Sequence, residues 1–124
     1  ANGDIVDAKT AVAALEQSGA DGVMIGRGAE GAPWVLAEIA HAIYGTPAPK
    51  IPQGAALADL MSAHYEHMLA FYGADLGVKV ARKHLGWYLD RAGADKTAVM
   101  VESNPAQVIV KLRHAIAAAE RHAA

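Results

Sequence analysis

One short run of residues, Gly22-Val23-Met24-Ile25-Gly26, limits what this chain can fold into more than any other feature. Its three apolar residues lie between glycines, which is typical of a short strand buried in a parallel sheet. We find no second run of this kind in the 124 residues. Because the backbone groups of a lone parallel strand need neighbouring strands, we expect its partners to come from upstream residues or from a second copy of the chain.

Helical patterns flank this strand on both sides. We expect one helix from about Asp7 to Ser18, ended by Gly19, and a second helix that begins at Pro33 and ends at Gly45. Helix, strand and helix in this order are the end of an alternating β/α pattern. The first part of the chain therefore predicts an α/β fold with a parallel sheet.

Three prolines, Pro47, Pro49 and Pro52, mark a boundary between this α/β part and the rest of the chain. Each removes a backbone donor and disfavours helical geometry in the residue before it. We interpret residues 47–54 as a linker and residues 55–124 as an all-α helical bundle, so that the chain is mostly helical overall. The expected helices cover about residues 55–72, 76–91, 95–101 and 105–123. The last has a strong start signal, with Asn104 as N-cap before Pro105.

Charge is distributed unevenly along the chain. Residues 1–78 hold three Lys/Arg against nine Asp/Glu, a balance of −6, whereas residues 79–124 hold eight against four, a balance of +4. A polyanionic partner would therefore bind the second part, although a solvated helix surface gives the same pattern.

Several classes of site are excluded or not expected. The chain has no cysteine, so it has no disulfide, no thiolate metal site and no cysteine nucleophile. It has neither a signal-peptide pattern nor a run of about eighteen apolar residues, and we expect a soluble, cytoplasmic protein with no membrane partner. His64 and His67 offer two imidazoles on one helix without a third ligand, so we expect no metal site.

Two loops have the chemistry of a phosphate site. Gly26-Arg27-Gly28 directly follows the expected strand, where backbone N–H groups attract anions, and Arg27 adds planar cationic donors. Asn2-Gly3-Asp4 lies one helix and one strand upstream, so both loops open on the same face. Together they favour a phosphate-bearing cofactor, whereas the glycine-rich loop alone is also compatible with a tight structural turn.

A basic stripe lies on the helix expected over residues 76–91. Lys79, Arg82, Lys83 and Gly86 share one face at three- and four-residue spacing, and the glycine would let a bulky partner approach closely. Such a stripe suits RNA phosphates, or it is only solvated surface. Five aromatic residues at helical spacing are expected in the core. They are Trp34, Phe71, Tyr72, Trp87 and Tyr88. For Trp87 and Tyr88 the alternative is a surface on which bases stack.

Taken together, these motifs make the chain resemble a known family, the bacterial tRNA-dihydrouridine synthases of the nitrogen-regulation-like group. The motifs that carry the resemblance are Asn2-Gly3-Asp4-Ile5, the run from Ser18 to Ala29, Pro33-Trp34, Arg82-Lys83-His84-Leu85 and Trp87-Tyr88. They occur in the family's order over nearly the whole chain. The resemblance implies that residues 1–46 are the C-terminal end of a flavin-binding TIM barrel and that residues 55–124 are a helical tRNA-binding domain.

The resemblance also implies a chemistry and a set of contact residues. NADPH reduces FMN, and the flavin passes a hydride to uridine in tRNA while a cysteine supplies the proton, which gives 5,6-dihydrouridine. The implied FMN contacts are Asn2, Gly3, Asp4, Gly26 and Arg27. The implied RNA contacts are Lys79, Arg82, Lys83 and His84. The chain departs from the family at Ala32, where an asparagine is usual.

The larger departure is that the catalytic cysteine, the residues that hold the flavin ring and most barrel strands are not in these residues. We therefore expect no catalytic residue here, and neither activity nor bound FMN for the chain alone. Two other classes stay open: a stand-alone helical interaction module without cofactor, and a phosphate-binding barrel enzyme without flavin. Because open strand edges tend to pair, we also expect a homo-oligomer formed through the N-terminal segment.

Overall fold

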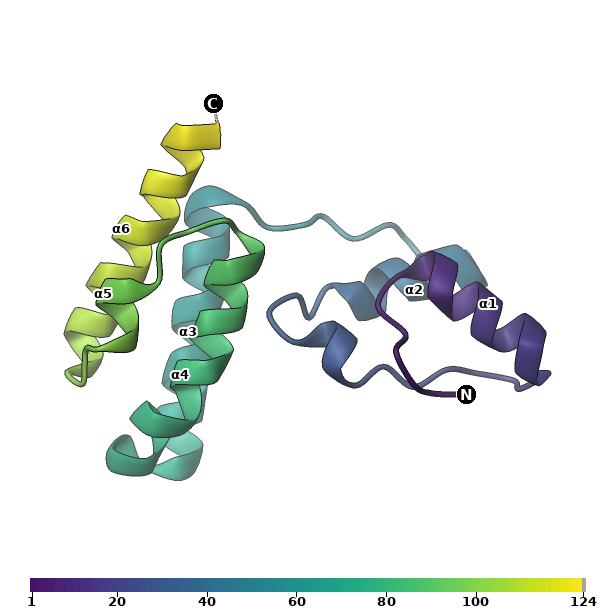
Figure 1. The fold of residues 1–124 in the computed structure, drawn as a ribbon, viewed down its shortest axis with the longest axis horizontal. Helices are drawn as coiled ribbons and strands as arrows, with labels where there is room; N and C mark the ends of the chain where they lie inside the picture. Colours follow the sequence, from purple (N-terminus) through teal and green to yellow (C-terminus); the bar gives the residue numbers. More distant parts are fainter. Residues whose placement is uncertain (124) are drawn as a thin grey trace. The chain divides into compact units, whose positions relative to one another are not determined.

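The computed structural model describes residues 1–123, which form two compact units, Ala1–Ile51 and the residues from Pro52 onward. Within these residues there are six α-helices, one 3₁₀ turn and no strand (Figure 1). The mostly helical character is confirmed. The expectation of an α/β remnant at the start of the chain is wrong for the chain as it stands.

The segment expected to be a strand is extended but nearly unpaired. The amino group of Ala1 donates to the Gly22 carbonyl at 2.8 Å, and the Met24 N–H donates to the Ala1 carbonyl at 2.8 Å. This alternation is the hydrogen-bond pattern of a parallel ladder. Only one residue, Ala1, pairs with this segment, so no regular strand forms. The physical reason for the wrong prediction is therefore the lack of partner backbone, since the apolar pattern itself is sound.

Two helices and one turn make up the first unit. They are α1 (Ala8–Ser18), the 3₁₀ turn η1 (Arg27–Ala29) and α2 (Val35–Tyr44). Asp7 caps α1, because its carboxylate accepts from the Thr10 N–H at 2.8 Å while the Thr10 hydroxyl accepts from the Asp7 N–H at 3.1 Å. The two helices end at the expected residues, Gly19 and Gly45.

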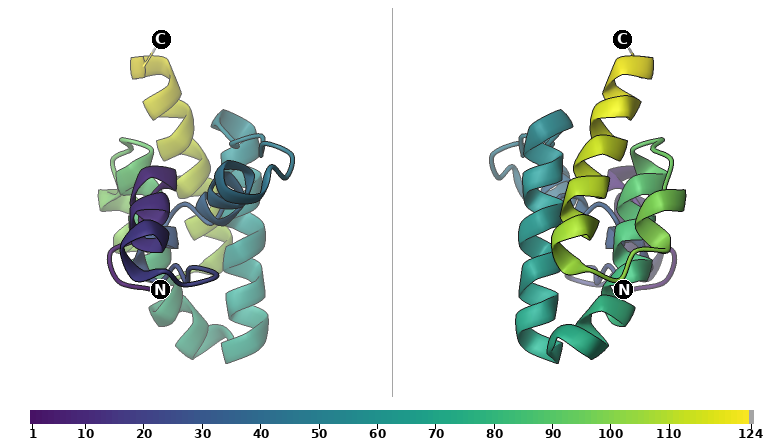
Figure 2. Two further views of the ribbon diagram at one scale, coloured as in Figure 1. Left: turned by 90° about the vertical axis from the view of Figure 1, so that its right-hand side faces the viewer. Right: turned by 90° about the vertical axis from the view of Figure 1, so that its left-hand side faces the viewer.

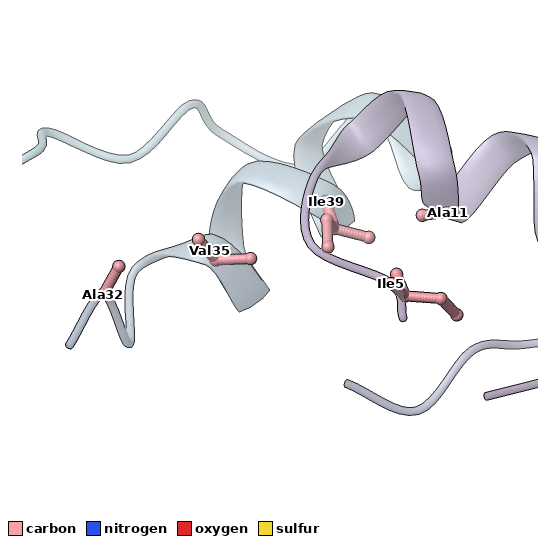
Figure 3. Packing of buried hydrophobic residues seen from close by; sticks show 5 residues of the cluster. All are labelled: Ile5, Ala11, Ala32, Val35 and Ile39. Atoms are coloured by element: carbon pink, nitrogen blue, oxygen red, sulfur yellow. The ribbon is translucent and has the colours of Figure 1, made fainter. Parts of the chain in front are cut away.

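A small apolar cluster holds the first unit together, with α1 packed against α2 (Figure 3). Its buried members are Ile5, Ala11, Ala32, Val35 and Ile39. Other large apolar side chains of this unit stay exposed, namely Val6, Val12, Met24, Leu36, Tyr44 and Ile51. The unit therefore buries only part of its apolar surface.

Four helices form the second unit, and all four were expected with nearly these bounds. They are α3 (Gly54–Tyr72), α4 (Ala74–Arg91), α5 (Thr97–Met100) and α6 (Pro105–Ala123). Asn104 begins α6 as expected, since its side-chain oxygen accepts from the Gln107 N–H at 3.1 Å.

The second unit is a helical bundle in which α3 packs against α4 and α6, and the short α5 folds back on α4 and α6 (Figure 1, Figure 2). The largest fully buried side chains are Met61, Tyr65, Leu85, Leu89, Val99 and Leu112. Helices α3 and α4 come close together at Gly77, where a Cβ would lie 2.9 Å from the Leu69 Cα. Only glycine lets α3 and α4 approach this closely.

The aromatic residues divide between core and surface. Tyr88 is buried, and Trp34 and Trp87 are partly buried. Phe71 and Tyr72 are 82% and 44% exposed, so the expectation that they belong to the core is wrong for this pair. They lie where α3 ends and the chain reverses into α4, so the pair projects at the tip of this helical hairpin.

No helix in residues 1–123 is long and apolar enough to cross a membrane. In the same residues, no three His, Cys, Asp or Glu side chains lie close enough together to share a metal ion.

Candidate functional site

The two loops expected to bind a phosphate pack directly against each other in the first unit. Gly28 is buried, and a Cβ added there would overlap the Ile5 carbonyl oxygen and lie 3.0 Å from the Val6 Cα. Ile5 is itself 3% exposed, in the centre of the apolar cluster. The core therefore fixes the spacing between residues 2–4 and residues 26–27.

Side chains from these two loops meet at the surface. An Arg27 guanidinium nitrogen lies 3.5 Å from an Asp4 carboxylate oxygen, and both side chains are almost fully exposed. Asp4 has a φ of 51°, and no other non-glycine residue in the described part of the chain has a positive φ. An exposed ion pair is weak, and the guanidinium has further donors for an added anion. Asn2, Gly3 and Gly26 are exposed on the same loops.

The four residues expected to contact RNA all lie on α4 but do not share one face. Lys79 and Arg82 line an open recess of about 410 Å³ together with Ser103 and Pro105, at the start of α6. Lys83 is exposed to solvent.

His84 lies on another side of α4, toward α3. Its ring centroid is 5.6 Å from that of His64 and 5.1 Å from that of Trp87, against which it packs edge to face. The structure therefore places Lys79 and Arg82 in one recess and His84 on a different side of α4.

Gly86 does not serve the role expected for it. The residue is buried, and a Cβ there would lie 3.5 Å from the Met100 sulfur. The short helix α5 folds back over this part of α4, so no external partner reaches the glycine. The basic face is accordingly shorter than the sequence pattern indicates.

A hydrogen bond between helices was not foreseen. His64 Nδ1 and the Tyr88 hydroxyl lie 2.9 Å apart and join α3 to α4. Burial lowers the pKa of His64, and the nearby charges of His84 and His67 lower it further. The two partners are 24 residues apart in sequence, so no local pattern indicated this contact.

Comparison with known proteins gives consistent matches along the chain. Residues 1–120 match the family model described as dihydrouridine synthase (Dus). The chain is 54% identical over 125 residues to a probable tRNA-dihydrouridine synthase of Rhodobacter capsulatus, which covers 100% of this chain and 38% of that protein. It is 42% identical to a probable tRNA-dihydrouridine synthase of Rhizobium leguminosarum bv. phaseoli, over 94% of this chain and 36% of the relative.

A third relative carries a more specific name. The tRNA-dihydrouridine synthase B of Xanthomonas axonopodis pv. citri is 47% identical over 88 residues, which is 71% of this chain and 26% of the relative. The chain thus spans little more than a third of the length of the curated relatives that it matches most fully.

Proposed function

We propose, from the premise that this chain belongs to the dihydrouridine synthase family, that it is part of a tRNA-dihydrouridine synthase whose helical unit contacts tRNA. One observation carries the tRNA assignment: Lys79 and Arg82 line the same recess beside the start of α6. Within residues 1–123, no carboxylate lies within ion-pair distance of either cation. The recess holds one carboxylate, Asp75, against these two cations, and its net positive charge suits a phosphate of a polyanion.

The other two expected RNA contacts, Lys83 and His84, lie outside this recess. Lys83 adds an exposed charge beside Arg82, and we assign it a contact that depends on charge more than on geometry. We assign His84 a contact with a base or a ribose, because the aromatic ring of Trp87 lies beside it on the same helix. Recognition of this kind reads the shape and backbone of folded RNA.

For the first unit we propose that its two loops hold the phosphate end of FMN. The packing of Gly28 on Ile5 keeps the loops together, and the exposed Arg27 guanidinium has donors to spare for a phosphate. The residues that would hold the group are Asn2, Gly3, Asp4, Gly26 and Arg27. When bound, the flavin supplies the hydride that NADPH provides to it. The residues of this chain bind and orient its phosphate.

We also propose that the chain alone is inactive, since it supplies no group that we assign to the reaction itself. Expected observations are no stoichiometric flavin absorbance in the purified chain and no oxidation of NADPH on addition of tRNA. Either signal, at the level of one per chain, would overturn this part of the proposal.

A second candidate function is favoured by one observation. Six large apolar side chains of the first unit are exposed, which suits an interaction module that forms a homo-oligomer through its N-terminal segment. Binding of tRNA separates the two candidates. A synthase fragment retards unmodified tRNA in an electrophoretic shift at low salt and releases it as salt rises. A module that only self-associates leaves tRNA free at every salt concentration.

A further inference from the structure

Arg82 has different surroundings from its neighbour Lys83. Whereas the lysine is exposed, Arg82 is half-buried, and its Nε atom is shielded from solvent. This nitrogen has no hydrogen-bond partner in the described part of the chain. Buried donors in native proteins are almost always paired, so an unpaired one needs an explanation.

A second unpaired polar atom lies in the same part of the bundle. Tyr65 of α3 is 1% exposed, and its hydroxyl also has no partner within residues 1–123. Burial raises the pKa of Tyr65, the charge of Arg82 lowers it and that of Glu102 raises it, so the three groups are neighbours. Two unpaired polar groups, one on α3 and one on α4, therefore lie in the same part of the bundle.

The carboxylate at this junction is already engaged. Glu102 accepts from the Lys111 ammonium at 2.6 Å and from the backbone N–H groups of Ser103 and Asn104 at 3.1 Å each. Glu102 therefore offers Arg82 little acceptor capacity, and its interactions hold the turn before α6 in place. The Arg82 side chain is left to face the recess of about 410 Å³ that it lines with Lys79 and Ser103.

We propose that this recess binds a single phosphate group, which in RNA is one backbone phosphodiester. Arg82 donates to the phosphate from the two terminal nitrogens of its guanidinium, Lys79 neutralises charge at the rim, and the Ser103 hydroxyl supplies a further donor. A recess of this volume has room for the attached ribose. Asp75, which also lines the recess, bars a second phosphate by like-charge repulsion. That the phosphate belongs to RNA rests on the proposed function. That the recess binds a phosphate rests on the recess itself.

The first experiment uses the 124-residue chain and inorganic phosphate as the probe. The Arg82 Nε–Hε signal is followed by ¹H–¹⁵N NMR and identified by its loss in Arg82→Lys. We expect a saturable, single-site shift of this signal, and no such shift with sodium chloride at equal ionic strength. Arg113, which is paired with Asp59 at 2.8 Å, is the internal control. An unmoved Arg82 signal, or an equal shift of Arg113, would overturn the inference.

The second experiment measures tRNA affinity for Arg82→Lys, which keeps the charge but loses the planar fork. We expect binding to weaken about tenfold, the scale of one lost charge-assisted hydrogen bond, with an unchanged slope of affinity against salt. Arg113→Lys makes the same change at the arginine paired with Asp59 and should bind as the parent does. Parental affinity of Arg82→Lys would show that the recess recognises charge alone and would overturn the inference while the proposed function stands. If the parent chain does not bind tRNA, the proposed function fails, and the phosphate titration alone decides the recess.

Discussion

Arg27 connects the two loops of the first unit, and the flavin assignment depends on it more than on any other side chain. In the complete enzyme, Arg27→Ala should weaken FMN binding by roughly 1–3 kcal/mol, because one charge-assisted contact to the phosphate is lost. Fluorescence of FMN released on dilution measures this loss. Lys9→Ala removes the same charge from the exposed side of α1 and should leave retention unchanged. Equal flavin retention in both variants would refute the assignment.

His64 makes the stability of the helical unit depend on pH. Its pKa in the folded chain lies below the ordinary 6.5 because of burial and the neighbouring histidines, so the unfolded chain binds its proton more readily. The stabilisation is full above pH 6.5 and is lost as the pH falls from there toward the folded pKa.

Thermal melts from about pH 7.5 to about pH 5 test this account. The melting temperature of the parent should fall below pH 6.5 more steeply than that of His64→Gln, which does not titrate there. His114→Gln, at an exposed position on α6, should follow the parent. Parallel curves for the parent and His64→Gln would contradict the role given to burial.

At the scale of elements, two glycines of α4 should respond to alanine in opposite directions. Gly77→Ala places a methyl group 2.9 Å from the Leu69 Cα and should cost roughly 1–3 kcal/mol of unfolding free energy. Gly86→Ala meets the Met100 sulfur at an ordinary 3.5 Å and should gain up to about 1 kcal/mol in helix propensity. Urea unfolding of both variants measures the difference. Equal stabilities would show that α3 and α4 do not cross as closely as described.

The elements were predictable wherever their signals are local. Asp7 and Asn104 cap helices through residues three positions away, and such short-range chemistry can be read from a sequence. The strand predicted at Val23 does not form, because strand pairing depends on backbone that is remote in sequence.

The candidate site was predictable to a similar extent. The basic residues of α4 and the two loops could be read from spacing and chemistry. The packing of α5 over Gly86 could not be predicted from the sequence, because it depends on a chain reversal with no fixed spacing. The same limit applies to the recess at Arg82, which joins α4 to residues about twenty positions further on.

At the scale of the whole molecule, the exposed apolar side chains of the first unit predict self-association. Sedimentation of the 124-residue chain should show an oligomer at micromolar concentration, because apolar surface and unpaired backbone are shared between copies. A chain shortened to begin at Gln53 keeps the helical bundle and should sediment as a monomer. If both are monomers, the extended segment finds sufficient partners within one chain.

Contact of the helical unit with tRNA is the central claim, and the salt dependence of binding tests it most directly. The slope of log affinity against log salt should flatten by about three when Lys79, Arg82 and Lys83 are all replaced by alanine, because each contact releases about one counterion. Alanine at Lys96 and Arg113, which are already paired with carboxylates, should leave the slope nearly unchanged. A triple variant with the parental slope would show that the basic residues of α4 are only solvated surface.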